Sequence, residues 1–211
     1  MVGMTGAEIR RKYDGFARWY DFAEGLAELL GVRRLRHALL RGASGRVLEV
    51  AVGTGNNFPC YPGTCRITAG DCSAAMLGIA RRRAGRLRLP VRFLSLDAEA
   101  LPLRARAFDT VVSSLSLCTF PDPVAALREM ARVCRPEGRI LLLEHGRSDR
   151  GWLGRWQDRS ADRHAKRLGC HWNRDPLEIV RGTGLRLIRA RRTFFGIFHV
   201  LEAMPVGKGG A

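Results

Sequence analysis

The chain has 211 residues, and its 36 Lys and Arg residues outnumber its 20 Asp and Glu residues, which gives a formal net charge of +16 at pH 7. A chain of this length forms one domain, or one domain with an appendage, and can bury about 70% of its unfolded surface. Its 46% hydrophobic and 27% charged residues exclude the disordered, collagen-like and disulfide-scaffold classes. No run approaches about 18 consecutive apolar residues, and charges stand where a signal peptide has its apolar segment, so we expect neither a membrane span nor secretion.

The excess of positive charge consists of 33 Arg residues and only three Lys residues, spread over the whole chain. Codon bias in a GC-rich genome explains this excess as well as an anionic partner does, whether phospholipid or nucleic acid, and charge alone does not separate these explanations. The six Cys residues form no C-x-x-C pair and no Cys/His cluster with zinc-finger spacing. We therefore expect reduced cysteines in a cytoplasmic protein, mostly as small apolar fillers, and no metal ion.

Two helices are expected at the N-terminus. Aromatic residues at spacings of three and four predict the first over residues 7–25. The second has an apolar face of leucines that starts at Leu26, and its other positions are strongly basic. The basic positions are Arg33, Arg34, Arg36, His37 and Arg41. Such a surface fits either a solvated helix face or adsorption to an anionic membrane.

The chain then alternates between short apolar runs and helical patterns. The runs lack strict polar alternation, as expected for strands that are covered on both faces. They lie at residues 46–50, 66–69, 91–96, 110–114 and 139–143. Ser73 and Asp122 are suitable N-caps for helices over residues 73–84 and 122–134, the second with Pro123 at its first position. This alternation predicts an α/β fold with a parallel, doubly wound sheet.

A glycine turn follows the first strand directly, in the sequence Arg46-Val-Leu-Glu-Val-Ala-Val-Gly-Thr-Gly-Asn-Asn57. Gly53 and Gly55 let the backbone approach a ligand closely, at the carboxyl ends of the strands where doubly wound sheets bind ligands. The dinucleotide fingerprint needs Gly or Ala at the position of Phe58, and no P-loop sequence is present. The turn therefore predicts a site for a ligand with an adenosine-like group and no phosphates.

Acidic residues lie within or after each of the first three strands. Asp71 lies 16 residues after Gly55, where a carboxylate can accept both hydroxyls of a ribose. Asp97 ends the third strand and is placed to accept from an adenine amino group. Glu49, within the first strand, is placed to orient the glycine turn or to balance a cation on the ligand. One such acid is weak evidence, because helix caps and turns also use acids, but three around one glycine turn are strong evidence for a site.

These motifs resemble those of class I S-adenosylmethionine-dependent methyltransferases, in the large methyltransferase type 11 (UbiE-like) group. The similarity covers about residues 40–146 and includes, besides the residues above, Phe108-Asp109 and the segment from Arg132 to Arg139. It implies S-adenosyl-L-methionine as the cofactor and a Rossmann-like seven-stranded sheet in the order 3-2-1-4-5-7-6 with the last strand antiparallel. The tail agrees, since residues 186–192 and 198–204 by themselves predict an antiparallel hairpin.

The resemblance also implies a division of the chain and a set of site residues. We expect a single methyltransferase domain with a helical cap (residues 1–42), a cofactor-binding core (43–146), and a lid segment with the hairpin (147–206). The family usually has Gly where this chain has Ala51, which leaves a lower cofactor affinity open. The expected cofactor-binding residues are Glu49, Ala51, Gly53, Gly55, Asn56, Asp71, Cys72, Asp97, Ala98 and Ser114.

A narrower similarity bears on the acceptor. The sequence resembles the branch of the family that contains the methyltransferase-like alkyl-thiol methyltransferases, which lies near the bacterial phosphatidylethanolamine and quinone methyltransferases. Its motifs are Asn57-Phe58, Tyr61-Pro62, Leu115-Ser-Leu-Cys118, Glu144-His145-Gly146 and Gly169-Cys-His-Trp-Asn173. The implied acceptor is a small or lipophilic molecule (a thiol, quinol or phospholipid amine). The cysteines and the N-terminal sequence lead us to expect a cytoplasmic location, and the basic helix adds contact at an anionic membrane as a further expectation.

Methyl transfer from a sulfonium requires alignment of the nucleophile with the methyl carbon and exclusion of water, and an amine or hydroxyl also needs a base. Glu144 and His145, at the end of the fifth strand, are the candidate catalytic residues, although a network acid and a semi-buried histidine are equally consistent with the sequence. Cys118 is expected to be a packed apolar residue. The aromatic and polar stretch between Trp152 and Trp172 fits either core packing or a lid over the acceptor pocket.

Two other functions are open on the sequence alone. A Rossmann oxidoreductase is disfavoured by Phe58 and the two-glycine turn. A methyltransferase fold that serves as a non-enzymatic binding module at an anionic membrane is less favoured, because the cofactor residues are intact. Nucleic acid is not the expected partner, since no Asn-Pro-Pro-Tyr-type tetrapeptide follows the fourth strand.

Overall fold

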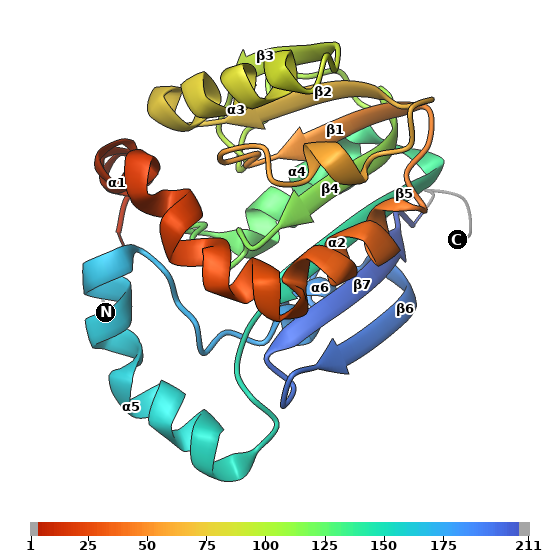
Figure 1. Ribbon diagram of the computed structural model, residues 1–211. Helices are drawn as coiled ribbons and strands as arrows, with labels where there is room; N and C mark the ends of the chain where they lie inside the picture. Colours follow the sequence, from red (N-terminus) through yellow and green to blue (C-terminus); the bar gives the residue numbers. More distant parts are fainter. Residues whose placement is uncertain (1–3, 207–211) are drawn as a thin grey trace.

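The computed structural model describes residues 4–206, without the side chains of Ala23, Glu24, Leu26 and Ala27. Its strands are β1 (Arg46–Val50), β2 (Arg66–Asp71), β3 (Val91–Ser95), β4 (Phe108–Ser114), β5 (Cys134–His145), β6 (Arg186–Thr193) and β7 (Phe198–Met204). They form one sheet in the order β3-β2-β1-β4-β5-β7-β6 (Figure 1). Strands β1 to β5 are parallel, and β7 is antiparallel to both β5 and β6. The predicted fold class, strand order and antiparallel last strand are confirmed.

Helices surround this sheet on both faces and at one edge. They are α1 (Gly6–Ala27), α2 (Arg33–Leu40), α3 (Ala74–Arg86), α4 (Pro123–Val133), α5 (Gly151–Leu168) and α6 (Pro176–Arg181). α2 and α3 pack on one face of the sheet, and α4 and α6 pack on the other. The arrowheads of the parallel strands point toward α1, which lies across their carboxyl ends, and α5 lies beside α1 (Figure 1). The carboxyl ends of the parallel strands are therefore covered by α1.

A hydrophobic core lies on each face of the sheet. Leu48 and Leu142 are fully buried under α4 and α6, whereas Val47 and Val112 are fully buried under α2 and α3. Neighbouring residues of a strand point to opposite faces, so a sheet that is covered on both faces needs apolar residues at every position. This explains why the central strands have continuous apolar sequences.

Both predicted helix caps are confirmed. The side chain of Ser73 accepts a hydrogen bond from the backbone N–H of Met76 at the start of α3. The side chain of Asp122 accepts from the N–H groups of Val124 and Ala125 at the start of α4. These bonds satisfy N–H groups that have no partner inside the helix, so the local sequence determines where both helices begin.

The second predicted helix is shorter than expected. A π-helical turn, η1 (Glu28–Val32), joins α1 to α2, and Gly31 within it has a φ of 133°, which side-chain-bearing residues rarely adopt. Leu26, assigned by the sequence to the apolar face of this helix, lies among the side chains outside the description. Arg36 corrects the prediction of a uniformly basic face, because it is 4% exposed and donates to Glu28 and Asn57.

α5 is an element that the sequence does not predict. Its inward positions are small or polar residues, so the usual apolar period of a buried helix face is missing. These positions are Gly154, Gln157, Ala161 and Ala165. Neither α5 nor any other helix in residues 4–206 is both long and apolar enough to cross a membrane.

Candidate active site

A cavity of about 510 Å³ lies at the carboxyl ends of the parallel strands. This volume is within the range of roughly 300–1,000 Å³ that is usual for small-molecule sites. Residues at the ends of β1, β2, β3 and β4 form its inner wall, and α1 forms its outer wall. The predicted cofactor residues that line it are Ala51, Gly53, Asp71, Cys72, Asp97, Ala98 and Ser114. The fold thus brings residues from four strand ends into one cavity.

The two glycines of the turn have different surroundings. Gly53 lines the cavity with a φ of 55°, and a Cβ there would meet no protein atom within 4 Å. Gly55 does not line the cavity, and a Cβ there would lie 2.5 Å from the ring of Phe58. The next residue, Asn56, turns away from the cavity and accepts a hydrogen bond from Arg83. Gly53 therefore leaves room for a ligand, whereas Gly55 leaves room for a core aromatic ring.

Two non-glycine residues at the cavity have left-handed backbone. Ala51 follows β1 with a φ of 53°, and Leu115 follows β4 with a φ of 57°. Such a conformation costs roughly 1–2 kcal/mol for a residue with a Cβ atom, because that atom approaches a carbonyl oxygen. This cost is a physical reason for the glycine that the family resemblance leads us to expect at the position of Ala51. Strained residues of this kind gather at functional sites.

Asp71 presents a mostly buried carboxylate to the cavity, and burial raises its pKa. Its Oδ2 atom accepts from the N–H of Gly53 at 2.9 Å, and its Oδ1 atom accepts from the N–H of Ser73 at 2.9 Å. Each carboxylate oxygen has a second lone pair, so both atoms can still accept from a ligand. Asp97, at the neighbouring strand end, accepts from the N–H of Glu99 at 2.9 Å. The two carboxylates offer acceptors on the same side of the cavity.

Glu49 lies behind the glycine turn and does not line the cavity. Its Oε1 atom accepts from Asn57 Nδ2 at 2.9 Å, and its Oε2 atom accepts from the hydroxyl of Tyr61 at 2.9 Å. Burial raises the pKa of Glu49 to about 7. Asn57 also donates to Ser114 Oγ at 3.0 Å, which connects the turn to β4. Of the two roles predicted for Glu49, the geometry favours orientation of the turn.

α1 closes the cavity from outside. Ile9, Tyr13 and Tyr20 contribute to the lining, whereas Trp19 is 66% exposed on another side of the helix. The lining includes no residue from the described segment after β5, so α5 does not roof this cavity. α5 contacts α1 instead, where Lys12 Nζ donates to the carbonyl oxygen of Lys166 at 2.7 Å. The cap is therefore α1, supported from behind by α5.

Two acidic residues, seven positions apart on α1, fix this helix to the core. Asp14 accepts from the N–H of Ala75 at 3.2 Å, at the N-terminus of α3. Asp21 accepts from Thr54 Oγ1 at 2.6 Å and forms a 2.6 Å ion pair with Arg83. A carboxylate at a helix N-terminus is favoured by the helix dipole. The same face of α1 thus contacts α3 and the glycine turn.

Glu144, one of the two predicted catalytic residues, is fully buried and does not line the cavity. Its carboxylate accepts from Ser113 Oγ at 2.9 Å and from the N–H groups of Ser116 and Leu117 at 2.8 and 3.1 Å. Burial raises its pKa to about 7. The bond from Ser113 joins Glu144 to β4, and the other two hold the loop after β4, whose residues Leu115 and Ser116 do line the cavity.

His145, the other predicted catalytic residue, also lies outside the cavity lining. Its Nε2 atom is 3.4 Å from the Sγ atom of Cys170. Cys118 completes this group, since the three side chains place their ligating atoms within 4.8 Å of one another. A hydrogen bond from Cys118, together with His145, lowers the pKa of Cys170 to about 4. The geometry thus connects His145 with two cysteines and not with the cavity.

Several lining residues have no signal in the sequence. Ile9 and Arg10 come from α1, and Glu99 and Phe120 come from loops after β3 and β4. Position is the one usable clue, because loops at the carboxyl ends of parallel strands meet at the same edge of the sheet.

The lining suits a nucleoside-like ligand that carries a positive charge. Asp71, Asp97 and Glu99 supply carboxylates, and Arg10 is the one basic side chain among the lining residues that the structure describes. Carboxylates accept from hydroxyl and amino groups and favour a nearby cation, whereas phosphates require N–H groups and basic side chains. These residues fit S-adenosyl-L-methionine, which has ribose hydroxyls, amino groups and a sulfonium.

Comparisons with known proteins agree with this fit. Residues 48–142 match the family described as "Methyltransferase domain". A phosphatidylethanolamine N-methyltransferase of Cereibacter sphaeroides is 37% identical over 161 residues, which cover 74% of this chain and 78% of that protein. A mitochondrial methyltransferase of Saccharomyces cerevisiae is 32% identical over 217 residues, which cover 92% of this chain but only 46% of the yeast protein.

A solved structure with the same fold is geranyl diphosphate C-methyltransferase from Streptomyces coelicolor, which contains S-adenosyl-L-homocysteine. The TM-score is 0.66 at 17% identity, over 86% of this chain and 82% of that one, so this likeness concerns the fold alone. The family match and the relative from Cereibacter sphaeroides show that the similarity to methyltransferases is also one of sequence. A demethylmenaquinone methyltransferase of Thermus thermophilus is also 37% identical, over 70% of this chain and 67% of that protein. The chain therefore belongs to the class I methyltransferases of the UbiE-like group, and its cofactor is S-adenosyl-L-methionine.

Proposed function

We propose that the chain transfers a methyl group to a lipophilic thiol, quinol or phospholipid amine at an anionic membrane surface. The cavity is the observation that supports this most directly. Its lining is acidic near β2 and β3, and near β4 and α1 it combines the apolar side chains of Ile9, Leu115 and Phe120 with polar ones such as Ser116 and Thr119. An amphipathic cavity of this kind suits a polar cofactor next to a lipophilic acceptor.

The acidic part of the cavity is the proposed cofactor site. Asp71 accepts from the ribose hydroxyls, and Asp97 accepts from the adenine amino group. Gly53 leaves space for the backbone to approach the ligand. When bound there, S-adenosyl-L-methionine supplies an electrophilic methyl group on a sulfonium. Ala98, Cys72 and Ser114 complete the proposed contacts.

The apolar part is the proposed acceptor site. Tyr13 and Tyr20 of α1 close it against water, and Leu115 and Phe120 form its inner side. Glu144 holds a loop and His145 contacts Cys170, so neither is assigned a proton transfer here. An acceptor that attacks as a thiolate or as a neutral amine needs no base during the attack itself. The name of the relative from Cereibacter sphaeroides supports a phospholipid amine among these classes.

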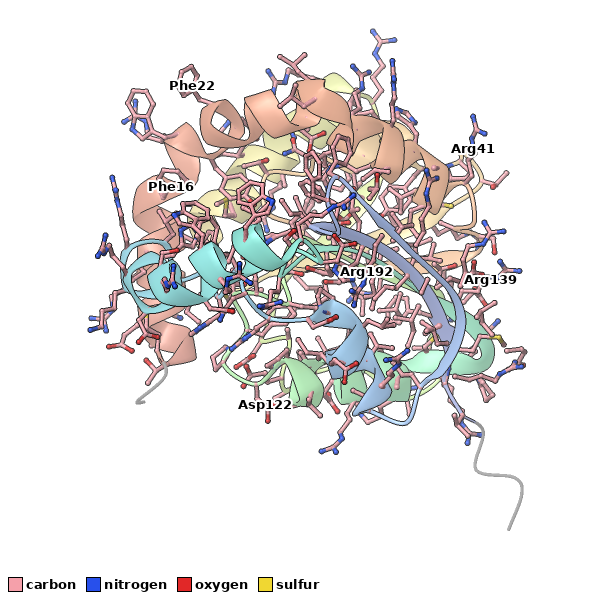
Figure 2. The ribbon with its side chains drawn as sticks, turned by 90° about the horizontal axis from the view of Figure 1, so that it is seen from below. Phe16, Phe22, Arg41, Asp122, Arg139 and Arg192 are labelled. Carbon is pink, nitrogen blue, oxygen red and sulfur yellow. The ribbon has the colours of Figure 1, made fainter. Side chains whose placement is uncertain are left out.

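An exposed apolar patch supports the membrane contact. We define it as Phe22, Leu29, Leu30, Trp152 and Phe195, each between 64% and 86% exposed. These residues come from α1, η1, α5 and the β6–β7 turn, and contacts of neighbouring residues join the β6–β7 turn to η1 and to the loop before α5. A Cβ at Gly31 would lie 2.9 Å from the Phe194 ring, and Ser148 Oγ donates to the carbonyl oxygen of Phe195 at 2.5 Å. Phe22 points away from the molecule (Figure 2).

Basic residues accompany the apolar patch. Arg33 and Arg34 are exposed directly after η1, and Arg155 is exposed on α5. Apolar insertion together with attraction to anionic lipid is the usual basis of peripheral membrane binding. Arg41, at the end of α2, also projects into solvent (Figure 2). The apolar patch thus provides side chains for insertion, and these arginines provide attraction to anionic lipid.

Release of S-adenosyl-L-homocysteine tests the proposed activity. We expect release with at least one acceptor class when thiols, quinols, amines and phospholipids are supplied in detergent. Asp71→Ala should weaken cofactor binding by about 1.5–3 kcal/mol, the range for hydrogen bonds to a charged group, while Asp158→Ala, on exposed α5, should bind normally. Unchanged affinity in Asp71→Ala contradicts the cofactor site. Cofactor binding without release for any class favours a binding module instead.

A further inference from the structure

Three sequence motifs without a role in the cavity meet at one place. Cys118 lies in the loop after β4, His145 ends β5, and Cys170 follows α5. The Sγ atoms of the two cysteines and a ring nitrogen of His145 lie within 4.8 Å of one another, and His145 Nε2 is 3.4 Å from Cys170 Sγ. Cys118 and Cys170 are 3% and 8% exposed. Two thiols and an imidazole are thus gathered in a largely buried position.

The backbone around these residues is fixed by hydrogen bonds. The N–H of His171 donates to the carbonyl oxygen of Cys118 at 2.8 Å. Arg174 donates to the carbonyl oxygens of Leu117 and Phe120, on either side of Cys118, at 2.8 and 2.7 Å. Gly169 ends α5 in left-handed conformation, with a φ of 74°, and so turns the chain at Cys170. These bonds join the segment after α5 to the loop after β4, and the bonds of Glu144 with Ser116 and Leu117 join that loop to the end of β5, so contacts that do not involve the thiols hold the three segments together.

The spacing agrees with a tetrahedral metal site. Zinc bonds of about 2.3 Å to sulfur and 2.0–2.1 Å to nitrogen imply separations of roughly 3.6 Å between S and N and 3.8 Å between two S atoms. The observed 3.4 Å between His145 Nε2 and Cys170 Sγ is close to the first value. The ligating atoms lie at most 4.8 Å apart, so the most distant pair must approach by about 1 Å to bind one ion, and rotation of the side chains can provide this.

We propose that Cys118, His145 and Cys170 bind a zinc ion. Thiolate and imidazole donors suit zinc, and three protein donors leave the fourth position to water or another small ligand. The ion joins the segment after α5 to the loop after β4, which carries the lining residues Ser116 and Thr119. This proposal departs from the expectation of no metal, and it does not rest on the proposed acceptor or activity.

Metal titration of the full chain tests the proposal directly. The protein is stripped with a chelator under reducing conditions and titrated with Zn²⁺ against a chromophoric chelator. We expect about one ion per chain. Titration with Co²⁺ should produce thiolate-to-cobalt charge-transfer absorption, which requires cysteine ligands. Absence of a stoichiometric site in both titrations overturns the proposal.

Variants identify the ligands. Cys118→Ser and Cys170→Ser should each weaken zinc binding by at least about 100-fold, since loss of an outer partner alone costs about 10–100-fold. His145→Cys should retain the ion with a third thiolate, whereas His145→Phe should lose it. Cys65→Ser is the matched control, because Cys65 donates to Ala43 elsewhere in the fold. Equal zinc affinity in Cys118→Ser, Cys170→Ser and Cys65→Ser overturns the assignment.

Alkylation of the unmodified chain gives a result even when a variant does not fold. Zinc should slow the alkylation of Cys118 and Cys170 but not of Cys72, which is exposed, and a chelator should remove this protection. Peptide mass spectrometry measures each thiol separately. Formation of a disulfide between Cys118 and Cys170 in the zinc-supplied protein once the reductant is removed, or equal alkylation rates with and without zinc, contradicts a metal site.

Discussion

Ala51 combines a left-handed backbone with a position at the cavity, and this permits a test of the strain. Replacement by glycine removes a cost of roughly 1–2 kcal/mol but adds about 0.4–1 kcal/mol of chain entropy to the unfolded state. We therefore expect Ala51→Gly to raise the free energy of unfolding by about 0.5–1 kcal/mol in denaturant titrations. Ala43→Gly, at a buried alanine away from the positive-φ positions, should lower it. A lower stability of Ala51→Gly would show that the strain is relieved elsewhere.

Glu49 and Glu144 make stability depend on pH in an unusual direction. Burial raises both pKa values from 4.5 to about 7, so the folded state binds more protons than the unfolded state between these values. Their contribution is fully present below about pH 4.5 and is lost as the pH rises through about 7. This is opposite to the behaviour of Glu129, whose pKa is lowered by its hydrogen bond with Arg132.

Glu144→Gln tests this dependence. The amide keeps an oxygen for the N–H groups of Ser116 and Leu117 but cannot ionise. We expect the variant to gain stability relative to the unmodified protein between pH 5 and pH 8, measured by denaturant unfolding at both values. Glu129→Gln is the control and should show no such gain. A difference that is constant across this pH range would show that Glu144 does not titrate there.

At the scale of the element, α1 is held by few polar contacts. Removal of both carboxylates, in Asp14→Ala with Asp21→Ala, should release α1 from α3 and from the glycine turn. Because α1 forms the outer wall of the cavity, we expect cofactor affinity to fall roughly tenfold, corresponding to about 1–2 kcal/mol, with little effect on the sheet. Calorimetry and limited proteolysis of α1 measure the two effects. Asp158→Ala removes a comparable ion pair, with Arg147, and should alter neither.

Elements were predictable where a local cause determines them. Ser73 and Asp122 start their helices through their own side chains, and the burial of both sheet faces gives the strands their apolar sequences. α5 was not predictable, because Gly154 and Gln157 occupy positions where a buried helix usually has large apolar residues. The kink at Gly31 also depends on packing, since Phe194 from the β6–β7 turn occupies the space beside it.

At the scale of the whole molecule, the apolar patch and the exposed arginines predict binding to anionic vesicles. The protein should sediment with phosphatidylglycerol vesicles at low salt and detach as ionic strength rises. Phe22→Ser with Leu29→Ser should weaken binding at all salt concentrations, whereas Arg33→Gln with Arg34→Gln should mainly reduce its salt dependence. Equal binding to neutral vesicles, or none at low salt, would leave a solvated surface as the explanation.

The cavity residues at the ends of β1, β2 and β3 were largely predictable from the sequence as residues of one cavity, and the rest were not. Gly53, Asp71 and Asp97 follow strand ends, and parallel strands bring their ends together. Glu144 also lies near a strand end in the sequence. Because both faces of the sheet are covered, the apolar pattern of the strand does not indicate whether a residue points to the cavity or into the interior. The group of Cys118, His145 and Cys170 comes from three distant segments, so no spacing rule detects it.

α1 has one side in the cavity wall and another side with exposed aromatic residues. A membrane surface that binds the exposed side of α1 therefore also contacts the helix that forms the outer wall of the cavity. Under the proposed function, the same helix borders both the exit of S-adenosyl-L-homocysteine and the entry of a lipid-borne acceptor. We then expect turnover to follow the surface concentration of the acceptor, so that diluting the acceptor with inert lipid slows turnover even when the total amount is unchanged.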